Sequence, residues 1–278
     1  MKILKNKGLY SVVILALIAV LFSNCKKDNE PAPAIPPVES FVIDFSDFDD
    51  GSKSSTLDLN NFRGIDTITY NNWGHAAFNV GFWNTIITVG LAVPVAAFRE
   101  AFNHQGVYQP DDETWIWTYH VWVFGVKYTP QLHAEIVDGY VHWKMYISQQ
   151  GGYSDFLWYT GESKLDGTEG TWTLYNSPNV PTPLVGITWH KNTDGIIGDI
   201  EYKNIVPDGP ENGGYIYHAL TADSLYDANY DIYNKGQDNL TKIEWSLDTK
   251  AGRVKDENHF GDTEWHCWDN LLQDIDCE

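Results

Sequence analysis

The chain has 278 residues, 43% of them apolar, so it can form one large domain or two small ones around a buried core. Its formal net charge of −20 would repel phosphate backbones, which argues against nucleic-acid binding and against docking on anionic lipid by charge alone. Aromatic residues reach 14%, and because Trp and Tyr pack well on pleated surfaces, this favours β structure.

The N-terminus has the parts of an export signal. Three lysines fall within the first eight residues, and residues 9–22 (LYSVVILALIAVLF) are uncharged and largely apolar. A helix of that length would cover about 21 Å, which is short of the ~30 Å hydrocarbon core of a bilayer. Residues 21–25 (LFSNC) resemble the lipobox of bacterial lipoproteins. The resemblance implies that residues 1–24 are removed and that acyl chains on Cys25 anchor the mature protein in membrane lipid.

The residues after Cys25 add to this resemblance. Residues 25–30 (CKKDNE) look like the basic-then-acidic start of surface-displayed lipoproteins of the Bacteroidota, which implies an outer-membrane anchor facing the periplasm or the cell surface. The alternative is an ordinary secreted protein with an N-terminal Cys. Four prolines follow within residues 30–38, and we expect residues 25–38 to form a semi-rigid tether. A single domain should then occupy residues 39–278.

The first part of this domain mixes strand and helix signals. Residues 40–47 and 64–70 are typical of strands. Residues 75–98 contain no Asp, Glu, Lys or Arg, and apolar residues recur there at the spacing of one helix face. We expect a helical insertion over residues 73–104 that covers the core, with Pro94 near the start of its second helix. The alternatives are a membrane span, or a strand over residues 85–89, which are rich in β-branched side chains.

From Glu113 onward the sequence is typical of β-strands separated by turns. Asp-Gly and Gly-Gly pairs such as Asp138-Gly139 divide the strands, and the short links favour antiparallel neighbours in a meander. The expected strands cover residues 114–128, 131–137, 140–148, 156–165, 170–176, 184–191, 196–205, 215–220, 226–233, 240–247 and 263–268.

The alternation along these strands predicts one buried and one solvated face. Val141, Trp143, Met145 and Ile147 alternate with polar side chains, for example. The predicted fold is therefore mainly β: a large curved antiparallel meander of about 10–12 strands, open or closed as a barrel, with residues 73–104 as a helical lid or plug. This loosely resembles lipocalin-type barrels and periplasmic lipid-carrier half-barrels, in architecture only.

The sequence carries no recognised catalytic motif. Phosphate-binding glycine loops, the GxSxG and HExxH signatures and zinc-ligand spacings are all missing from it, so we expect no catalytic residues, no metal and no cofactor. Whether the protein is an enzyme stays open, although a binding role is favoured. Cys267 and Cys277 form an even pair in a chain predicted to be exported, which favours a disulfide over two separate thiols.

Aromatic residues are the strongest remaining functional signal. Residues 115–124 (WIWTYHVWVF) are apolar on both faces of an extended strand, so both faces should be covered or line a cavity. The residues expected to contact a ligand are Trp83, Trp115, Trp117, Tyr119 and Trp122.

Three functions follow from these signals. The first is a non-catalytic lipoprotein that binds an apolar small molecule or a partner segment in its curved sheet. The second is a surface glycan-binding protein, because exposed Trp and Tyr can stack on sugar rings. The third, less favoured, is a glycan-active hydrolase or lyase, which would need two carboxylates facing each other across a groove.

Overall fold

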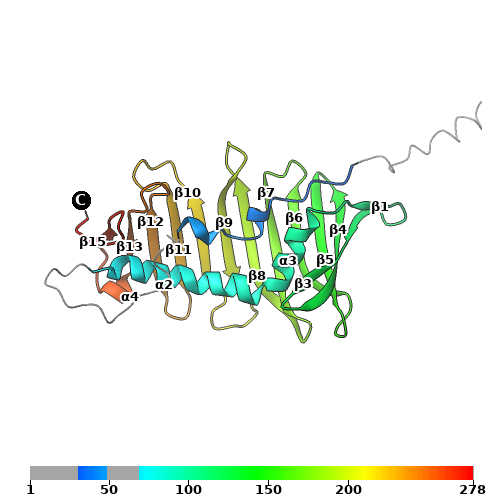
Figure 1. The fold of residues 1–278 in the computed structure, drawn as a ribbon, viewed down its shortest axis with the longest axis horizontal. Helices are drawn as coiled ribbons and strands as arrows, with labels where there is room; N and C mark the ends of the chain where they lie inside the picture. Colours follow the sequence, from blue (N-terminus) through cyan, green and yellow to red (C-terminus); the bar gives the residue numbers. More distant parts are fainter. Residues whose placement is uncertain (1–30, 49–68, 278) are drawn as a thin grey trace, which may run out of the picture.

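A computed structural model of the chain describes residues 31–48 and 69–277. The expected signal over residues 1–24, Cys25 and the start of the tether lie outside the described residues, as does most of the strand expected over residues 64–70. Figure 1 shows one long, twisted sheet with helices and an N-terminal segment lying across one face. This confirms the mainly β fold with a helical cover.

Fifteen strands make up the sheet. They are β1 (Val107–Gln109), β2 (Thr114–Thr118), β3 (Val121–Val123), β4 (Val126–Val137), β5 (Tyr140–Gln149), β6 (Phe156–Lys164), β7 (Glu169–Ser177), β8 (Val180–Lys191), β9 (Ile197–Asn204), β10 (Tyr215–Leu220), β11 (Ala228–Asn234), β12 (Asn239–Trp245), β13 (Gly252–Lys255), β14 (His266–Trp268) and β15 (Asp274–Ile275).

The strand order confirms the antiparallel meander. Each strand from β4 to β15 pairs with its neighbour in the sequence, and β4 also pairs with β2 and β3, with β1 outside β2. The sheet is open because β1 and β15 form opposite edges, so the closed alternative is wrong. The Asp138-Gly139 turn joins β4 to β5 with positive φ at both residues, as a two-residue hairpin requires.

Within residues 31–48 and 69–277, the helical cover consists of six elements. They are η2 (Val38–Ser40), η3 (Phe45–Asp47), α2 (Asn71–Thr85), the π-helical turn η4 (Ile86–Gly90), α3 (Ala92–Ala101) and α4 (Glu257–Phe260). The helical alternative for residues 85–89 is therefore correct and the strand alternative is wrong. The predicted helix face is buried throughout; its residues are Ala76, Val80, Trp83, Ile87 and Leu91.

The alternative to a helical cover over residues 73–104 was a membrane span. Among the described residues, no single helix is long and apolar enough to cross a bilayer. By length and composition alone, residues 71–90 and 92–101 could do so only together, as a pair bent by 72°. Both helices bury side chains in the core, among them Trp83 and Phe98.

Residues 40–47 do not form the predicted strand. They run between η2 and η3 across the covered face of the sheet, and Phe41, Val42 and Ile43 are buried in succession. The hydroxyl of Tyr202 on β9 donates a hydrogen bond to the Phe41 carbonyl, and the Asp44 carboxylate accepts one from the Ser46 amide. Backbone groups thus find partners without a strand ladder, which is why an apolar run that reads as a strand forms part of the cover.

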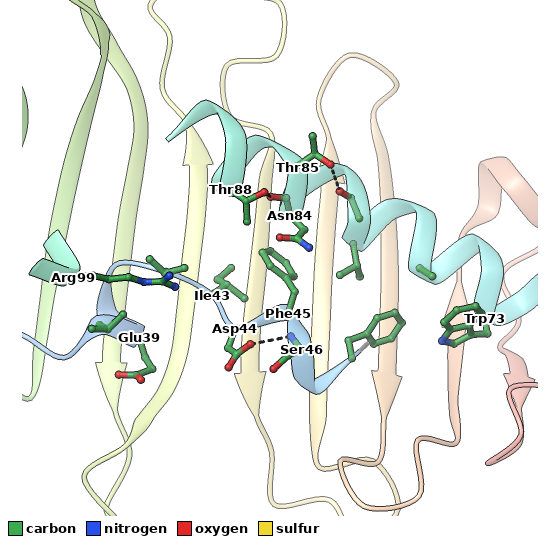
Figure 2. Close-up of a pocket in the computed structure, with 16 residues that line it drawn as sticks. Glu39, Ile43, Asp44, Phe45, Ser46, Trp73, Asn84, Thr85, Thr88 and Arg99 are labelled. Atoms are coloured by element: carbon green, nitrogen blue, oxygen red, sulfur yellow. Dashed lines mark hydrogen bonds between the residues drawn. The ribbon is translucent and has the colours of Figure 1, made fainter. Parts of the chain in front are cut away.

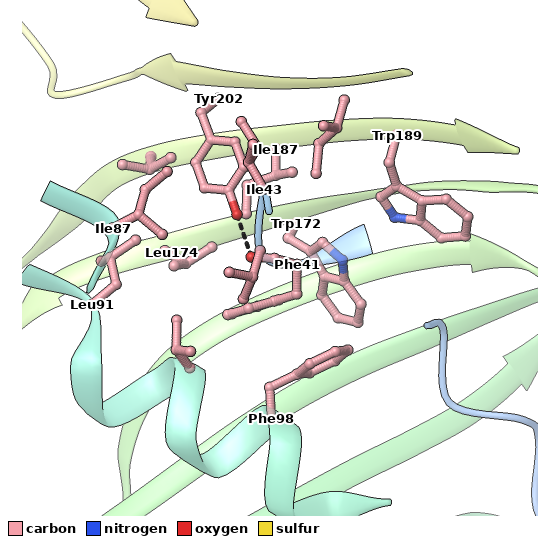
Figure 3. Close-up of a cluster of buried hydrophobic side chains, with 14 of the residues drawn as sticks. Phe41, Ile43, Ile87, Leu91, Phe98, Trp172, Leu174, Ile187, Trp189 and Tyr202 are labelled. Carbon is pink, nitrogen blue, oxygen red and sulfur yellow. Dashed lines mark hydrogen bonds between the residues drawn. The ribbon is translucent and has the colours of Figure 1, made fainter. Parts of the chain in front are cut away.

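The core lies between this cover and the sheet (Figure 3). Phe41 stacks on Phe98 of α3 with ring centroids 4.5 Å apart, and the Trp172 indole meets both rings edge-on. Ala32 and Ile35 of the proline-rich stretch also pack against the core. Side chains from both layers therefore fill the middle of the covered face.

The aromatic stretch predicted as one strand over residues 114–128 is divided among β2, β3 and β4. The side that carries Trp115 and Trp117 is buried, as expected. On the opposite side, Trp122 is 67% exposed and Phe124 is 82% exposed. The expectation that both faces are covered is wrong, because the cover lies on only one side of the sheet.

The C-terminus is fastened to the start of α2. Cys267 and Cys277 form the predicted disulfide, with Cα atoms 5.3 Å apart. Between them, the Asp274 carboxylate accepts hydrogen bonds from the amides of Asn71 and Asn72. A residue some two hundred positions away in sequence thus caps the helix, since the side chain of its N-cap residue does not bond to the first turn.

Candidate binding groove

A hollow with a volume of about 1010 Å³ lies beside α2. We call it the α2–α4 groove, since these two helices bound it along with the ends of β9, β11 and β12. Its lining residues are Asn71, His75, Phe78, Asn79, Phe82, Trp83, Ile86, Asn204, Glu211, Gly214, Ile232, Tyr233, Asn234, Gln237, Asn239, Thr241, Asp256, Asn258 and His259.

One side of the groove is aromatic. Phe78 and Phe82 are four positions apart on α2 and therefore share a helix face. They are 74% and 59% exposed, whereas Trp83 beside them is buried. Two large apolar side chains at these exposures contribute little to the core, so they are available to a ligand.

The rest of the lining is rich in neutral polar groups. Seven amide side chains take part: Asn71, Asn79, Asn204, Asn234, Gln237, Asn239 and Asn258. Each amide offers two donors and an acceptor with two lone pairs. Some of this capacity is used internally, because Asn79 donates to the His75 carbonyl and Asn239 donates to Asp256.

A buried carboxylate organises one end of the groove. Asp256 is 3% exposed and accepts hydrogen bonds from Asn239 (2.9 Å), Thr241 (2.6 Å) and the His259 amide (3.1 Å), the last of which caps α4. Its fourth partner is His75 Nε2 at 2.8 Å. Burial acts to raise the pKa of the Asp256 carboxyl, but these hydrogen bonds outweigh it and hold the pKa below its usual value.

The pKa of the His75 ring lies below its usual value, which favours the neutral ring. Burial lowers this pKa more than the bond to Asp256 raises it. Since the ionised carboxylate can only accept, Nε2 carries the proton of that bond. The ring also stacks on His259 with centroids 3.7 Å apart, which ties α2 to α4.

The chemistry available in this cluster is recognition and positioning. An Asp–His pair can serve a nucleophile, but the Thr241 hydroxyl that lines the groove donates its hydrogen to Asp256. Among residues 31–48 and 69–277, no group of three or more His, Cys, Asp or Glu side chains is placed to hold a metal ion.

A second hollow of about 590 Å³ lies between residues 38–48 and the helices (Figure 2). Two of its hydroxyl groups are engaged with the helix backbone: Thr85 donates to the Gly81 carbonyl and Thr88 to the Asn84 carbonyl. Its lining also carries the charged side chains of Glu39, Asp44 and Arg99.

The five aromatic residues predicted to contact a ligand are not brought together. Trp83 lines the α2–α4 groove, whereas Trp115, Trp117 and Tyr119 are buried in the core at the other end of the sheet. Tyr119 donates its hydroxyl hydrogen to the Ala97 carbonyl of α3. Trp122 lies exposed on the open face.

Sequence reasoning missed most of the groove. Phe78 and Phe82 lie outside the stripe of buried positions on an uncharged helix. The helix periodicity could therefore have predicted that these two aromatic side chains are exposed. The amides come from segments far apart in sequence, and nothing in their local pattern marks them as neighbours.

Comparison with known proteins gives no relative from which the role of this site could be inferred. No family model, no curated protein and no solved structure matches this chain.

Proposed function

We propose that this protein is an exported, lipid-anchored binding protein that holds a neutral oligosaccharide in the α2–α4 groove and does not transform it. The observation that carries the proposal is the pair of exposed rings, Phe78 and Phe82, lining one groove with seven amide side chains. Sugar rings offer apolar C–H faces that stack on aromatic rings and hydroxyls that pair with amides.

The polar lining favours a sugar over an apolar ligand. Covering amides with an acyl chain would remove them from water without replacing their hydrogen bonds, at a cost of about 1–3 kcal/mol per group. Hydroxyl groups replace those bonds. The apolar-ligand alternative has less support also because the residues expected to form its site, such as Trp115 and Trp117, are packed in the core.

Charge narrows the class of glycan. A protein with a net charge of −20 repels polyanionic polysaccharides at long range. Asp256 and Glu211 add negative charge to the groove itself. A neutral oligosaccharide is not repelled by this negative charge.

The lipid anchor is the part of the proposal that rests on sequence. The signal over residues 1–24 and the lipobox ending at Cys25 support an anchor in the outer membrane. The stretch after Cys25 supports exposure at the cell surface, where polysaccharides are encountered.

Titration with a panel of neutral oligosaccharides tests the binding function. We expect a saturable change in Trp fluorescence, because Trp83 lines the groove. Replacing Phe78 or Phe82 with Ala should weaken binding about tenfold, equivalent to about 1.4 kcal/mol of lost stacking.

Val89→Ala is the matched control, since Val89 is exposed on the same helical layer but does not line the groove. It should bind like wild type. Unchanged binding in both Phe variants would contradict the proposal, as would the lack of a response to every glycan. Recovery of the oligosaccharide at its original length tests the absence of catalysis.

A further inference from the structure

A second group of exposed apolar side chains lies at the opposite end of the sheet from the groove. Phe102 follows α3, Val107 is on β1, Trp122 is on β3, and Phe124 is in the turn after β3. These elements lie at the same edge of the sheet, since β1 pairs with β2, β2 and β3 both pair with β4, and His104 beyond α3 stacks on Tyr119. We call these four residues the β3 edge surface.

Both the backbone conformation and the exposure of Phe124 are unusual for a large apolar residue with only a structural role. It occupies the first position of a two-residue turn between Val123 and Val126, with φ of 50°, and Gly125 follows with φ of 79°. Asn or Gly adopts that conformation readily, whereas a bulky side chain is strained there. At 82% exposure the Phe124 ring gains almost nothing from burial. Strain without burial indicates a contact outside the folded chain.

Trp122 extends the same surface onto the open face. Its neighbours Val121 and Val123 point into the core, so the indole points away from it and is 67% exposed. Lys127 lies directly across from it on β4. Trp, Phe and Lys side chains together are typical of segments that sit at the level of lipid headgroups.

The tether places this end of the molecule near lipid. Figure 1 shows that the described chain begins at the end of the sheet that carries β1 and β4, and its first described residue is Pro31. The chain from Cys25 to Pro31 can span at most about 20 Å. The α2–α4 groove, over β9–β12, lies toward the other end.

We propose that the β3 edge surface rests in the interfacial layer of the bilayer that holds the anchor, so that the sheet stands away from the membrane with the groove at its far end. This inference rests on the anchor in the proposed function and not on the identity of the glycan. Apolar insertion supplies the contact, because Asp111, Asp112 and Glu113 in the β1–β2 turn repel anionic headgroups.

Fluorescence quenching by brominated lipid tests the contact. The full mature protein is placed in vesicles of zwitterionic phospholipid with bromine on shallow acyl positions. We expect quenching of wild-type Trp emission that is mostly lost in Trp122→Phe. Trp265→Phe, the control, removes a Trp that stacks on Arg253 at the other end of the sheet and should be quenched like wild type. Equal quenching of wild type and Trp122→Phe would overturn the inference.

A substitution in the turn separates a membrane contact from a structural role. Phe124→Asn suits the positive φ and should keep or raise stability. In the Cys25→Ser protein, which cannot receive the anchor, it should lower partition onto the same vesicles about tenfold. Unchanged partition, or a dimer of the Cys25→Ser protein in solution that Phe124→Asn dissolves, would overturn the inference.

The state of the anchor is measured separately. Intact mass and vesicle flotation of the wild-type protein report acylation of Cys25. A protein without acyl mass would contradict the anchor and this inference with it, whereas an acylated protein without Trp122 quenching would contradict this inference alone.

Discussion

At the scale of single residues, Asp256 has the largest structural consequence in the groove. One buried carboxylate joins β12 through Asn239 and Thr241, α4 through the His259 amide, and α2 through His75. Removing a partner from such a network leaves buried donors unpaired, which costs more than an average hydrogen bond contributes. The position of α2 over the sheet, and with it the exposed face of Phe78 and Phe82, depends on this network.

The same network makes stability depend on pH. The pKa of His75 is lowered by burial, so on acidification below about 6.5 the unfolded chain takes up a proton before the folded protein does, and the free energy of unfolding falls. The pKa of Asp256 is also lowered, so its stabilisation is present above about 3.8 and is lost as the pH drops through its folded-state pKa.

Urea unfolding at several pH values measures the His75 contribution. His75→Gln keeps a donor for Asp256 but cannot titrate, so its unfolding free energy should fall less than that of wild type between pH 7.5 and 5. His133, whose pKa is lowered by burial and by Lys144, contributes equally to both proteins and cancels in the difference. Parallel pH profiles would contradict the role assigned to His75.

At the scale of elements, the strands are held in register by indoles that lie over glycines. The Trp172 indole on β7 covers Gly161 on β6, Trp189 on β8 covers Gly170 on β7, and Trp268 on β14 covers Gly252 on β13. In each case a Cβ on the glycine would meet the neighbouring indole at 2.0 to 2.8 Å. Glycine thus provides the space in which a large side chain packs flat on the next strand.

Gly161→Ala tests this packing. The added Cβ would lie 2.0 Å from Cε3 of Trp172 and 2.8 Å from the Thr171 carbonyl oxygen, so the indole and the strand must both shift. We expect a loss of about 3 kcal/mol in the free energy of unfolding, measured by urea denaturation.

Gly186→Ala, in β8, is the control. The nearest atom to its new Cβ is 3.4 Å away on the Ile205 side chain, so stability should stay the same or rise by about 0.5 kcal/mol. Equal losses in the two variants would show that strand glycines matter for another reason than the indoles.

At the scale of the whole molecule, an open sheet must protect two edges from pairing with other chains. Both edges end in very short strands, β1 with three residues and β15 with two. The β15 edge is fastened by the Cys267–Cys277 disulfide and by the bonds of Asp274 to α2. The start of the helical cover and the end of the sheet therefore stabilise each other.

Removing the disulfide should destabilise both the β15 edge of the sheet and the start of α2. Cys277→Ser removes the cross-link across ten residues, with an expected cost of about 2–3 kcal/mol. Hydrogen exchange should rise in β14, β15 and the first turn of α2, while β5–β8 keep their protection. Reductant should reproduce this in wild type and have no further effect on the variant. Unchanged exchange in α2 would contradict the coupling.

Much of this architecture could be predicted from the sequence. Alternation along residues 140–148 and 184–191 marked the buried faces, Asp138-Gly139 marked a hairpin, and the uncharged run over residues 75–98 marked the helical cover. These are local signals, because side-chain period and turn geometry depend on neighbours within a few residues. The pairing of Cys267 with Cys277 was also predictable, since a single pair remained.

The binding groove was decided only by the tertiary structure. Phe78, Asn204 and Asp256 become neighbours because α2 crosses the strands, and no local rule fixes where along the sheet a helix crosses. For the same reason residues 40–47 form part of the cover although their apolar run is typical of a strand: the Phe41 carbonyl and the Ser46 amide have partners in Tyr202 and Asp44. Periodicity determines which side chains are buried, while contacts between distant segments determine what covers them and which side chains remain exposed to a ligand.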